Sequence, residues 1–198
     1  MPNYKIADLL ENPENTQRLY GYCGKIARIN LTTQAVSYVE TAQYVPKYLG
    51  GRGICTKIFW DEVGPGVKAF DPENKIIYMT GATTGTGIPT GGRTVFGSIS
   101  PEQYAWSGIG GWFGSELKFA GFDGFILEGR AAQPTYLYIE DGAIEFRSAE
   151  PLWGMLVHAT QAKLEDSRAI AQRYPGCELT VAYIDSYGES VGASWIAD

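Results

Sequence analysis

The chain has 198 residues, of which 44% are hydrophobic and 19% are charged, and its formal net charge is −6 at pH 7. This balance is typical of a globular chain with an apolar core, and the negative charge argues against broad nucleic-acid binding, which needs a basic surface. No run of 18 apolar residues occurs, so we expect no membrane span, and the polar N-terminus lacks the apolar core of a signal peptide. We therefore expect a cytoplasmic protein.

The predicted elements of the first half are an extension, a hairpin and an interrupted helix. Residues 1–19 are interpreted as an N-terminal extension that precedes the folded part, which we assign to residues 20–198. Residues 25–41 contain two β-rich runs around turn formers, which predicts a β-hairpin. Between residues 42 and 63 the apolar spacing fits a helix that is interrupted near residues 50–53. Two buried strands follow, over residues 75–81 and 93–100.

The second half contains the strongest local signal of the chain. Alternating apolar residues flank Asp141 and Gly142, a pair that favours a type I′ hairpin turn. Helices are predicted over residues 112–120 and 156–174, and strands over residues 124–129, 179–185 and 191–197. The pattern predicts an α+β fold with two mostly antiparallel β-sheets and short flanking helices. Because the sequence stops while it still has the pattern of an apolar strand, we expect the domain to be truncated at its C-terminal end.

Two glycine-rich segments are the first candidates for a functional site. Residues 80–100 hold six glycines and a single charged residue, Arg93, which follows Gly91 and Gly92. Arg93 is either an ordinary surface or ion-paired arginine, or a guanidinium that forks onto a phosphate or a heterocycle. The second segment is either a turn into a helix or a place where backbone faces a ligand. Its glycines are Gly108, Gly110, Gly111 and Gly114. Neither segment matches a Rossmann fingerprint or a P-loop.

Other polar residues give weaker signals. The segment Tyr48 to Gly53 is either a second arginine-bearing ligand loop or a kink that allows close helix packing, and we favour packing. The acidic residues show no pair whose spacing predicts acid–base catalysis. Three widely spaced cysteines and one histidine predict neither a disulfide framework nor a zinc site, and we interpret them as structural residues. The acidic residues are Asp61, Glu62, Glu116 and Asp123, the cysteines are Cys23, Cys55 and Cys177, and the histidine is His158.

Several motifs, in order and at near-constant spacing from about Tyr20 to Asp198, carry a family resemblance. They are GKIARINLTTQAVSY, YLGGRG, DPENKIIYMTGATTGTGIPTGGRTVFGSISP, GGWFGSELKFAGFDGFILEGRA, YLYIEDGAIEFRSAEPLWG and VAYIDSYGESV. Together they resemble the N-terminal domain of the tungsten-containing aldehyde ferredoxin oxidoreductases. The combination of P-T-G-G-R with the later G-G-x-F-G-x-E-L-K-F-A-G-x-D is highly specific for this family.

The resemblance implies a role for both glycine segments. In the family, the N-terminal domain is a base of two β-sheets on which a tungsten bis-pterin cofactor lies. The resemblance assigns cofactor contacts to Arg93, Gly91, Gly92, Gly108, Gly110 and Gly111. It also implies that the backbone carbonyl of Gly108 binds a magnesium ion that bridges two pterin phosphates. Gly108 stands where the family has asparagine, which puts the magnesium site in doubt.

The resemblance further implies an oxidoreductase of anaerobic metabolism. Such an enzyme converts an aldehyde and water to a carboxylic acid and passes electrons through a 4Fe-4S cluster to ferredoxin or an iron–sulfur subunit. The cluster ligands and the catalytic residues near the metal lie outside this chain, so we assign it no catalytic residue and expect it to be inactive alone. We expect an oligomer. The alternatives are the active-site subunit of a tungsten-dependent aromatic-CoA reductase and a non-catalytic cofactor-binding or assembly module.

Overall fold

The computed structural model describes residues 20–100, 103–165, 181–184 and 193–196. The predicted extension over residues 1–19 lies outside the described residues. The same holds for the part of the predicted helix 156–174 that follows α5 (Val157–Glu165), and for Cys177. None of the described helices is long and apolar enough to cross a membrane.

A six-stranded mixed sheet forms the centre of the fold, with the strand order β2-β1-β6-β3-β4-β5. Strands β1 and β6 pair in parallel, and the four other neighbouring pairs are antiparallel. The strands are β1 (Lys25–Asn30), β2 (Ala35–Glu40), β3 (Lys75–Met79), β4 (Thr94–Ile99), β5 (Tyr104–Ile109) and β6 (Gly124–Glu128). Because β1 and β6 are far apart in the chain, the sheet depends on long-range pairing.

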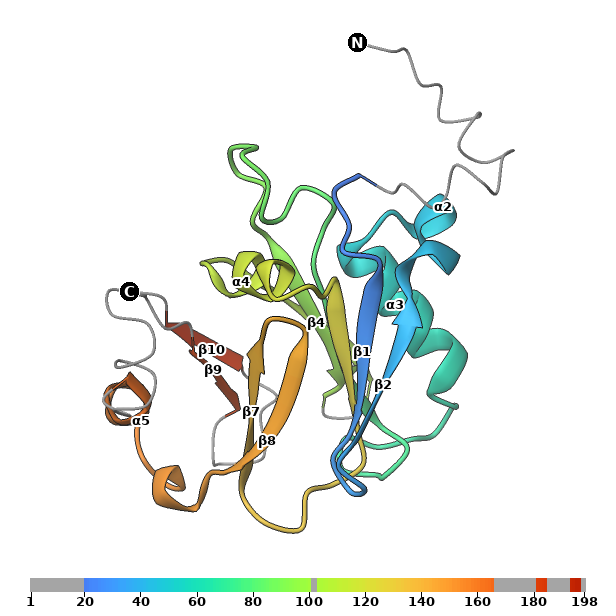
Figure 1. The fold of residues 1–198 in the computed structure, drawn as a ribbon. Helices are drawn as coiled ribbons and strands as arrows, with labels where there is room; N and C mark the ends of the chain where they lie inside the picture. Colours follow the sequence, from blue (N-terminus) through green and yellow to red (C-terminus); the bar gives the residue numbers. More distant parts are fainter. Residues whose placement is uncertain (1–19, 101–102, 166–180, 185–192, 197–198) are drawn as a thin grey trace.

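The sheet is covered on both faces (Figure 1). On one face, α3 (Gly51–Glu62) packs its buried Ile54 and Ile58 against sheet residues such as Ile77. On the other face lie α4 (Phe113–Phe119) and the antiparallel ribbon of β7 (Thr135–Glu140) and β8 (Ala143–Ser148). Alternation along each strand sends neighbouring residues to opposite faces, so both apolar clusters are built from the same strands.

Both predicted hairpins are present. Strands β1 and β2 pair in the 25–41 segment, and β7 and β8 are joined at Asp141 and Gly142. The φ angles of Asp141 and Gly142 are 44° and 83°, as a type I′ turn requires. The α+β prediction, with mostly antiparallel sheets and short flanking helices, is confirmed by the six-stranded sheet and the β7–β8 ribbon. Strands β9 (Val181–Ile184) and β10 (Ala193–Ile196) form a further antiparallel pair.

The predicted helix between residues 42 and 63 is interrupted as expected. It divides into η2 (Thr41–Gln43), α2 (Val45–Tyr48) and α3, and the break between the last two lies at Leu49 and Gly50. A Cβ atom added at Gly53 would lie 2.3 Å from the carbonyl oxygen of Tyr48, closer than any real contact. The glycine at this position is therefore required by packing, as the sequence analysis favoured.

One strand was not predicted. Strand β5 extends into the second glycine segment, which we interpreted as either a turn into a helix or a place where backbone faces a ligand. Its sequence, YAWSGI, has few β-branched residues, so its strand character is weak locally. Pairing with β4, from Thr94 opposite Ile109 to Ile99 opposite Tyr104, decides its conformation. This pairing positions the candidate site.

Candidate functional site

The two glycine segments meet at one end of the six-stranded sheet. Residues 81–92 join β3 to β4, and the second segment begins at the end of β5, which pairs with β4 so that Val95 lies opposite Gly108. A Cβ atom built on Gly108 would lie 3.1 Å from Nη1 of Arg93, so the arginine side chain lies over this glycine. A Cβ atom on Gly92 would lie 3.9 Å from the carbonyl oxygen of Gly111. The fold thus brings together residues from both segments.

The surface formed by Arg93, Gly108, Gly110 and Gly111, here called the glycine surface, is exposed. A Cβ atom added at Gly110 or Gly111 would meet no atom within 4 Å. Among the described residues, Arg93 forms no ion pair. The guanidinium is therefore available to a ligand, and the backbone beside it can be approached closely.

Gly91 has a different environment. A Cβ atom there would lie 2.9 Å from the carbonyl oxygen of Thr83, within the same loop. The Gly91 carbonyl accepts hydrogen bonds from the hydroxyls of Thr83 and Thr84, each at 3.2 Å. Packing inside the loop accounts for this glycine, and its contact with a cofactor stays a prediction.

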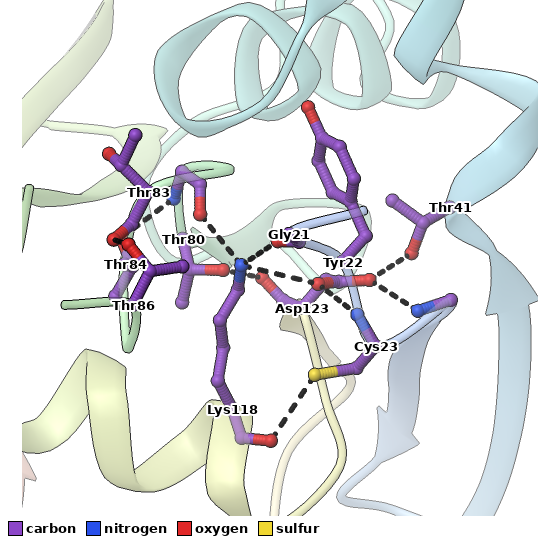
Figure 2. A network of polar contacts seen from close by, with 12 residues as sticks. Gly21, Tyr22, Cys23, Thr41, Thr80, Thr83, Thr84, Thr86, Lys118 and Asp123 are labelled. Carbon is purple, nitrogen blue, oxygen red and sulfur yellow. Dashed lines mark hydrogen bonds and ion pairs between the residues drawn. The ribbon is translucent and has the colours of Figure 1, made fainter. Parts of the chain in front are cut away.

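A buried carboxylate lies beneath this end of the sheet (Figure 2). Asp123 is 1% exposed and precedes β6 directly. It accepts hydrogen bonds from the backbone N–H groups of Cys23 at 2.9 Å and Gly24 at 2.8 Å, and from the hydroxyl of Thr41 at 2.7 Å. Hydrogen bonds of this kind offset the cost of burying a charge. The network also fixes the entry into β1.

Lys118 balances the charge of Asp123 and ties two loops together. Its Nζ atom lies 3.8 Å from Oδ1 of Asp123. The same ammonium donates to the carbonyl oxygen of Gly81 at 2.8 Å, and to that of Gly21 (Figure 2). Burial lowers the pKa of Lys118, and the charge of Asp123 partly opposes this effect. Lys118 therefore anchors the start of the 81–92 loop, which leads to Arg93.

The end of α4 positions both charged residues. Gly121 has a φ of 93° and donates to the carbonyl oxygen of Lys118 at 2.9 Å, while Phe122 donates to that of Leu117 at 3.1 Å. This pair of bonds is a Schellman motif, which ends a helix and reverses the chain direction. The reversal places Asp123 close to Lys118 although α4 and β6 are different elements.

The two described cysteines are held as thiols. Cys55 is fully buried, as predicted for a core residue, and burial raises its pKa to about 11. Cys23 is exposed, contrary to our expectation, because the chain before β1 lies at the surface. Its thiol donates to the carbonyl oxygen of Lys118 at 3.2 Å, and partial burial of the sulfur together with Asp123 raises its pKa. Neither has the lowered pKa of a nucleophile.

Comparison with known families decides the family of the chain. The family model described as "Aldehyde ferredoxin oxidoreductase, N-terminal domain" matches residues 26–196. The chain belongs to the aldehyde ferredoxin oxidoreductase family. The resemblance given by the motifs of the two glycine segments is thereby confirmed.

Members of the aldehyde ferredoxin oxidoreductase family are also the curated relatives of the chain. A "Tungsten-containing aldehyde ferredoxin oxidoreductase" of Pyrococcus abyssi is 45% identical over 152 residues, which cover 75% of this chain and 25% of that protein. A protein of the same name from Thermococcus kodakarensis is 38% identical over 87% of this chain and 28% of its own. The chain thus spans about a quarter of the length of these relatives.

A solved structure shares the fold. The structure titled "Active site complex BamBC of Benzoyl Coenzyme A reductase in complex with 1,5 Dienoyl-CoA" superposes with a TM-score of 0.75 at 33% sequence identity. The match covers 83% of this chain and 25% of that chain. The arrangement of sheets and short helices is therefore common to this family and that complex.

The glycine surface fits the kind of cofactor that the family resemblance implies. A flat heterocycle needs backbone without side chains, and Gly110 and Gly111 leave that space open. A planar guanidinium such as that of Arg93 can donate paired hydrogen bonds to such a ring or to its phosphate. In the part of the chain that the structure describes, no group of three or more His, Cys, Asp or Glu side chains could hold a metal.

The sequence analysis missed the roles of Lys118 and Asp123. We considered Asp123 only as a possible acid or base, whereas the structure places it in a buried ion pair. A signal was present, because both residues belong to the motif E-L-K-F-A-G-x-D that carries the family resemblance. Their partners, Gly21, Gly81 and Thr41, are distant in sequence, so spacing alone could not reveal the network.

Proposed function

We propose that this chain is the cofactor-binding N-terminal part of a tungsten-dependent aldehyde ferredoxin oxidoreductase. The intact enzyme takes an aldehyde and water to a carboxylic acid, two protons and two electrons, and passes the electrons through a 4Fe-4S cluster to ferredoxin. The observation that carries the proposal is the glycine surface of a member of this family, where Arg93 lies over Gly108 and forms no ion pair with the described residues. The tungsten bis-pterin, when bound, supplies the two-electron chemistry.

The residues of this chain hold and orient that cofactor. Arg93 donates hydrogen bonds to a pterin, and Gly92, Gly108, Gly110 and Gly111 allow the ring to approach the backbone. The backbone carbonyl of Gly108 would help to hold a magnesium ion that accompanies the cofactor. Lys118 acts as a positioning residue, since it fixes the loop that ends at Arg93. The remaining parts of the enzyme supply the iron–sulfur cluster and the substrate pocket. The assembly is cytoplasmic and oligomeric.

A second candidate function is supported by one observation. The benzoyl coenzyme A reductase active-site complex shares the fold at a TM-score of 0.75 and 33% identity. An aromatic-CoA reductase would use the same cofactor base with a different substrate pocket. The curated relatives favour the aldehyde enzyme, because those named tungsten-containing aldehyde ferredoxin oxidoreductase reach 45% identity.

The two candidates can be separated with the full-length enzyme that contains this chain. We expect anaerobically purified enzyme to contain tungsten and pterin and to reduce a viologen dye when an aldehyde is added. An aromatic CoA thioester should be unreactive as electron acceptor with reduced dye. Enzyme that contains tungsten and pterin but reacts only with the thioester would replace the main proposal by the second. Enzyme without pterin would contradict both.

A further inference from the structure

A second arginine, on α3, lies against β5, the strand that carries Gly108. Arg52 is the second residue of α3, and its Cζ atom lies 4.3 Å from the centroid of the Trp106 ring on β5. Both side chains are exposed. A guanidinium over an indole ring is stabilised by cation–π attraction, which orients the arginine while it remains in contact with solvent.

Trp106 connects this arginine to the glycine surface. Trp106 and Gly108 are two residues apart on β5, so they lie on the same face of the sheet. The Cβ position of Gly108 is 3.9 Å from Cζ3 of Trp106 and 3.1 Å from Nη1 of Arg93. The indole ring and the Arg93 guanidinium therefore border the same bare residue. Arg52 is connected to them through its contact with the indole ring.

Neither arginine is neutralised by a carboxylate of the described residues. By contrast, two other arginines form ion pairs. Nη2 of Arg28 lies 2.6 Å from Oε1 of Glu62, and Nη2 of Arg147 lies 2.7 Å from Oε2 of Glu145. Within the described ranges, Arg52 and Arg93 have no carboxylate within ion-pair distance. Two like charges near one exposed indole ring favour an anion, because the anion offsets their repulsion.

We propose that Arg52 and Trp106 form a second anion-binding position next to Arg93, and that this position binds a phosphate group of the cofactor. The inference rests on the proposed function. The Arg52 guanidinium lies over the indole ring, and among the described residues it forms no ion pair. Its N–H groups can therefore form the paired hydrogen bonds by which a guanidinium binds a phosphate. Gly53 next to Arg52 serves the packing of α3, whereas the arginine side chain serves the ligand.

Binding of inorganic pyrophosphate to the 198-residue chain tests this inference without the metal. Arg130 offers a matched control, since it is also exposed and without an ion pair among the described residues, and it follows β6 at the opposite end of the sheet. We expect Arg52→Gln and Arg93→Gln each to weaken pyrophosphate binding about tenfold, the effect of losing one charge-assisted contact. Arg130→Gln should leave the affinity unchanged. Trp106→Leu should weaken binding roughly threefold, since it removes the stacked ring and not the charge.

Circular dichroism of each variant separates loss of binding from loss of fold. An affinity of Arg52→Gln equal to that of Arg130→Gln would overturn the inference, as would wild-type chain that binds no pyrophosphate. The proposed function is tested separately by the tungsten and pterin content of full-length wild-type enzyme. A cofactor-loaded enzyme whose Arg52→Gln variant keeps all its pterin would remove this phosphate position and leave the proposed function intact.

Discussion

The buried network around Asp123 and the exposed glycine surface differ in how far the chain itself accounts for them. Asp123 accepts hydrogen bonds from three groups and has Lys118 as its counter-ion. At the glycine surface, Arg93 lacks an ion pair among the described residues, and Gly110 has no neighbour that requires a glycine. Contacts within the molecule explain the first region, and the cofactor that we propose for this chain would explain the second.

This difference separates residues that maintain the fold from residues that we propose bind the cofactor. Substitutions in the buried network should change the free energy of unfolding of this chain. Substitutions on the glycine surface should leave that free energy nearly unchanged and reduce cofactor content in the full-length enzyme. Both regions lie at the same end of the six-stranded sheet, so the contrast does not arise from their position in the fold. It reflects whether each group already has a partner.

The largest effect on stability is expected for Asp123→Ala. The substitution leaves the ammonium of Lys118 buried without its counter-ion, which typically costs about 3–5 kcal/mol. Urea unfolding followed by tryptophan fluorescence measures the change. Thr41→Val is the milder companion, because it removes one hydrogen bond to the same carboxylate and should cost about 1 kcal/mol. Equal stabilities of Asp123→Ala and wild type would show that the network is not structural.

A smaller loss is expected for Gly124→Ala. A Cβ atom at this position would lie 2.3 Å from the carbonyl oxygen of Tyr78 in the neighbouring strand, so the backbone must shift. Overpacking of this kind costs roughly 1–3 kcal/mol. Gly64→Ala is the control, since a Cβ atom there meets nothing within 4 Å. Equal thermal unfolding midpoints of the two variants would contradict the claim that β3 and β6 pack too closely at Gly124 for a side chain.

A pH-dependent effect is expected at the opposite end of the sheet, in the cluster around Glu128. Burial alone would raise the pKa of Glu128, but hydrogen bonds and charges of Lys75 and Arg28 outweigh it, so the pKa is lowered. A carboxyl group with a lowered pKa stabilises the fold above its unfolded pKa, and this stabilisation is lost as the pH falls through the folded pKa. Glu128→Gln should therefore cost about 1 kcal/mol at pH 7.

The cost of Glu128→Gln should shrink progressively below pH 4.5, the ordinary pKa of the group. Urea unfolding of wild type and variant at pH 7 and at acidic pH provides the comparison. A difference that stays constant over this range would mean that the charge of Glu128 does not contribute.

The smallest effect on stability is expected for Gly110→Ala. Its Cβ atom would meet nothing within 4 Å, and Gly110 does not have a positive φ, so the free energy of unfolding should change by less than about 0.5 kcal/mol. In the full-length enzyme the added methyl group should still reduce pterin content, because it occupies the space that the flat ring needs. The comparison would be contradicted if Gly110→Ala changed both the free energy of unfolding and the pterin content, or changed neither of them.

Much of the fold could be predicted because its signals are local. The turn at Asp141 and Gly142 lies between strands that follow each other directly, and the interruption before α3 lies at a glycine with a φ of 139°. The parallel pairing of β1 with β6 joins residues about a hundred positions apart, as Ile26 and Gly124 show. No periodicity in the sequence reports such a pairing. Strand β5 was missed for a related reason, since pairing with β4 overrides its weak local tendency.

The candidate site was accessible from sequence only in part. Arg93 and the glycines were identified through the family motifs, not through their spacing. The hydrogen bonds of Lys118 to Gly21 and Gly81 span 97 and 37 residues, so they exist only once the sheet is formed. The stacking of Arg52 on Trp106 likewise joins α3 to a strand that was not predicted. Residue identity could be read from motifs, whereas the arrangement of partners required the fold.

The central claim is that the glycine surface binds the pterin cofactor through Arg93. Its most direct measurement is the tungsten and pterin content of full-length enzyme carrying Arg93→Ala or Arg93→Lys, with Arg130→Gln as the control. We expect both Arg93 variants to lose most of the cofactor while the control remains loaded, because lysine keeps the charge and cannot provide the planar fork of hydrogen bonds. Full cofactor loading of the Arg93→Ala enzyme would contradict the claim.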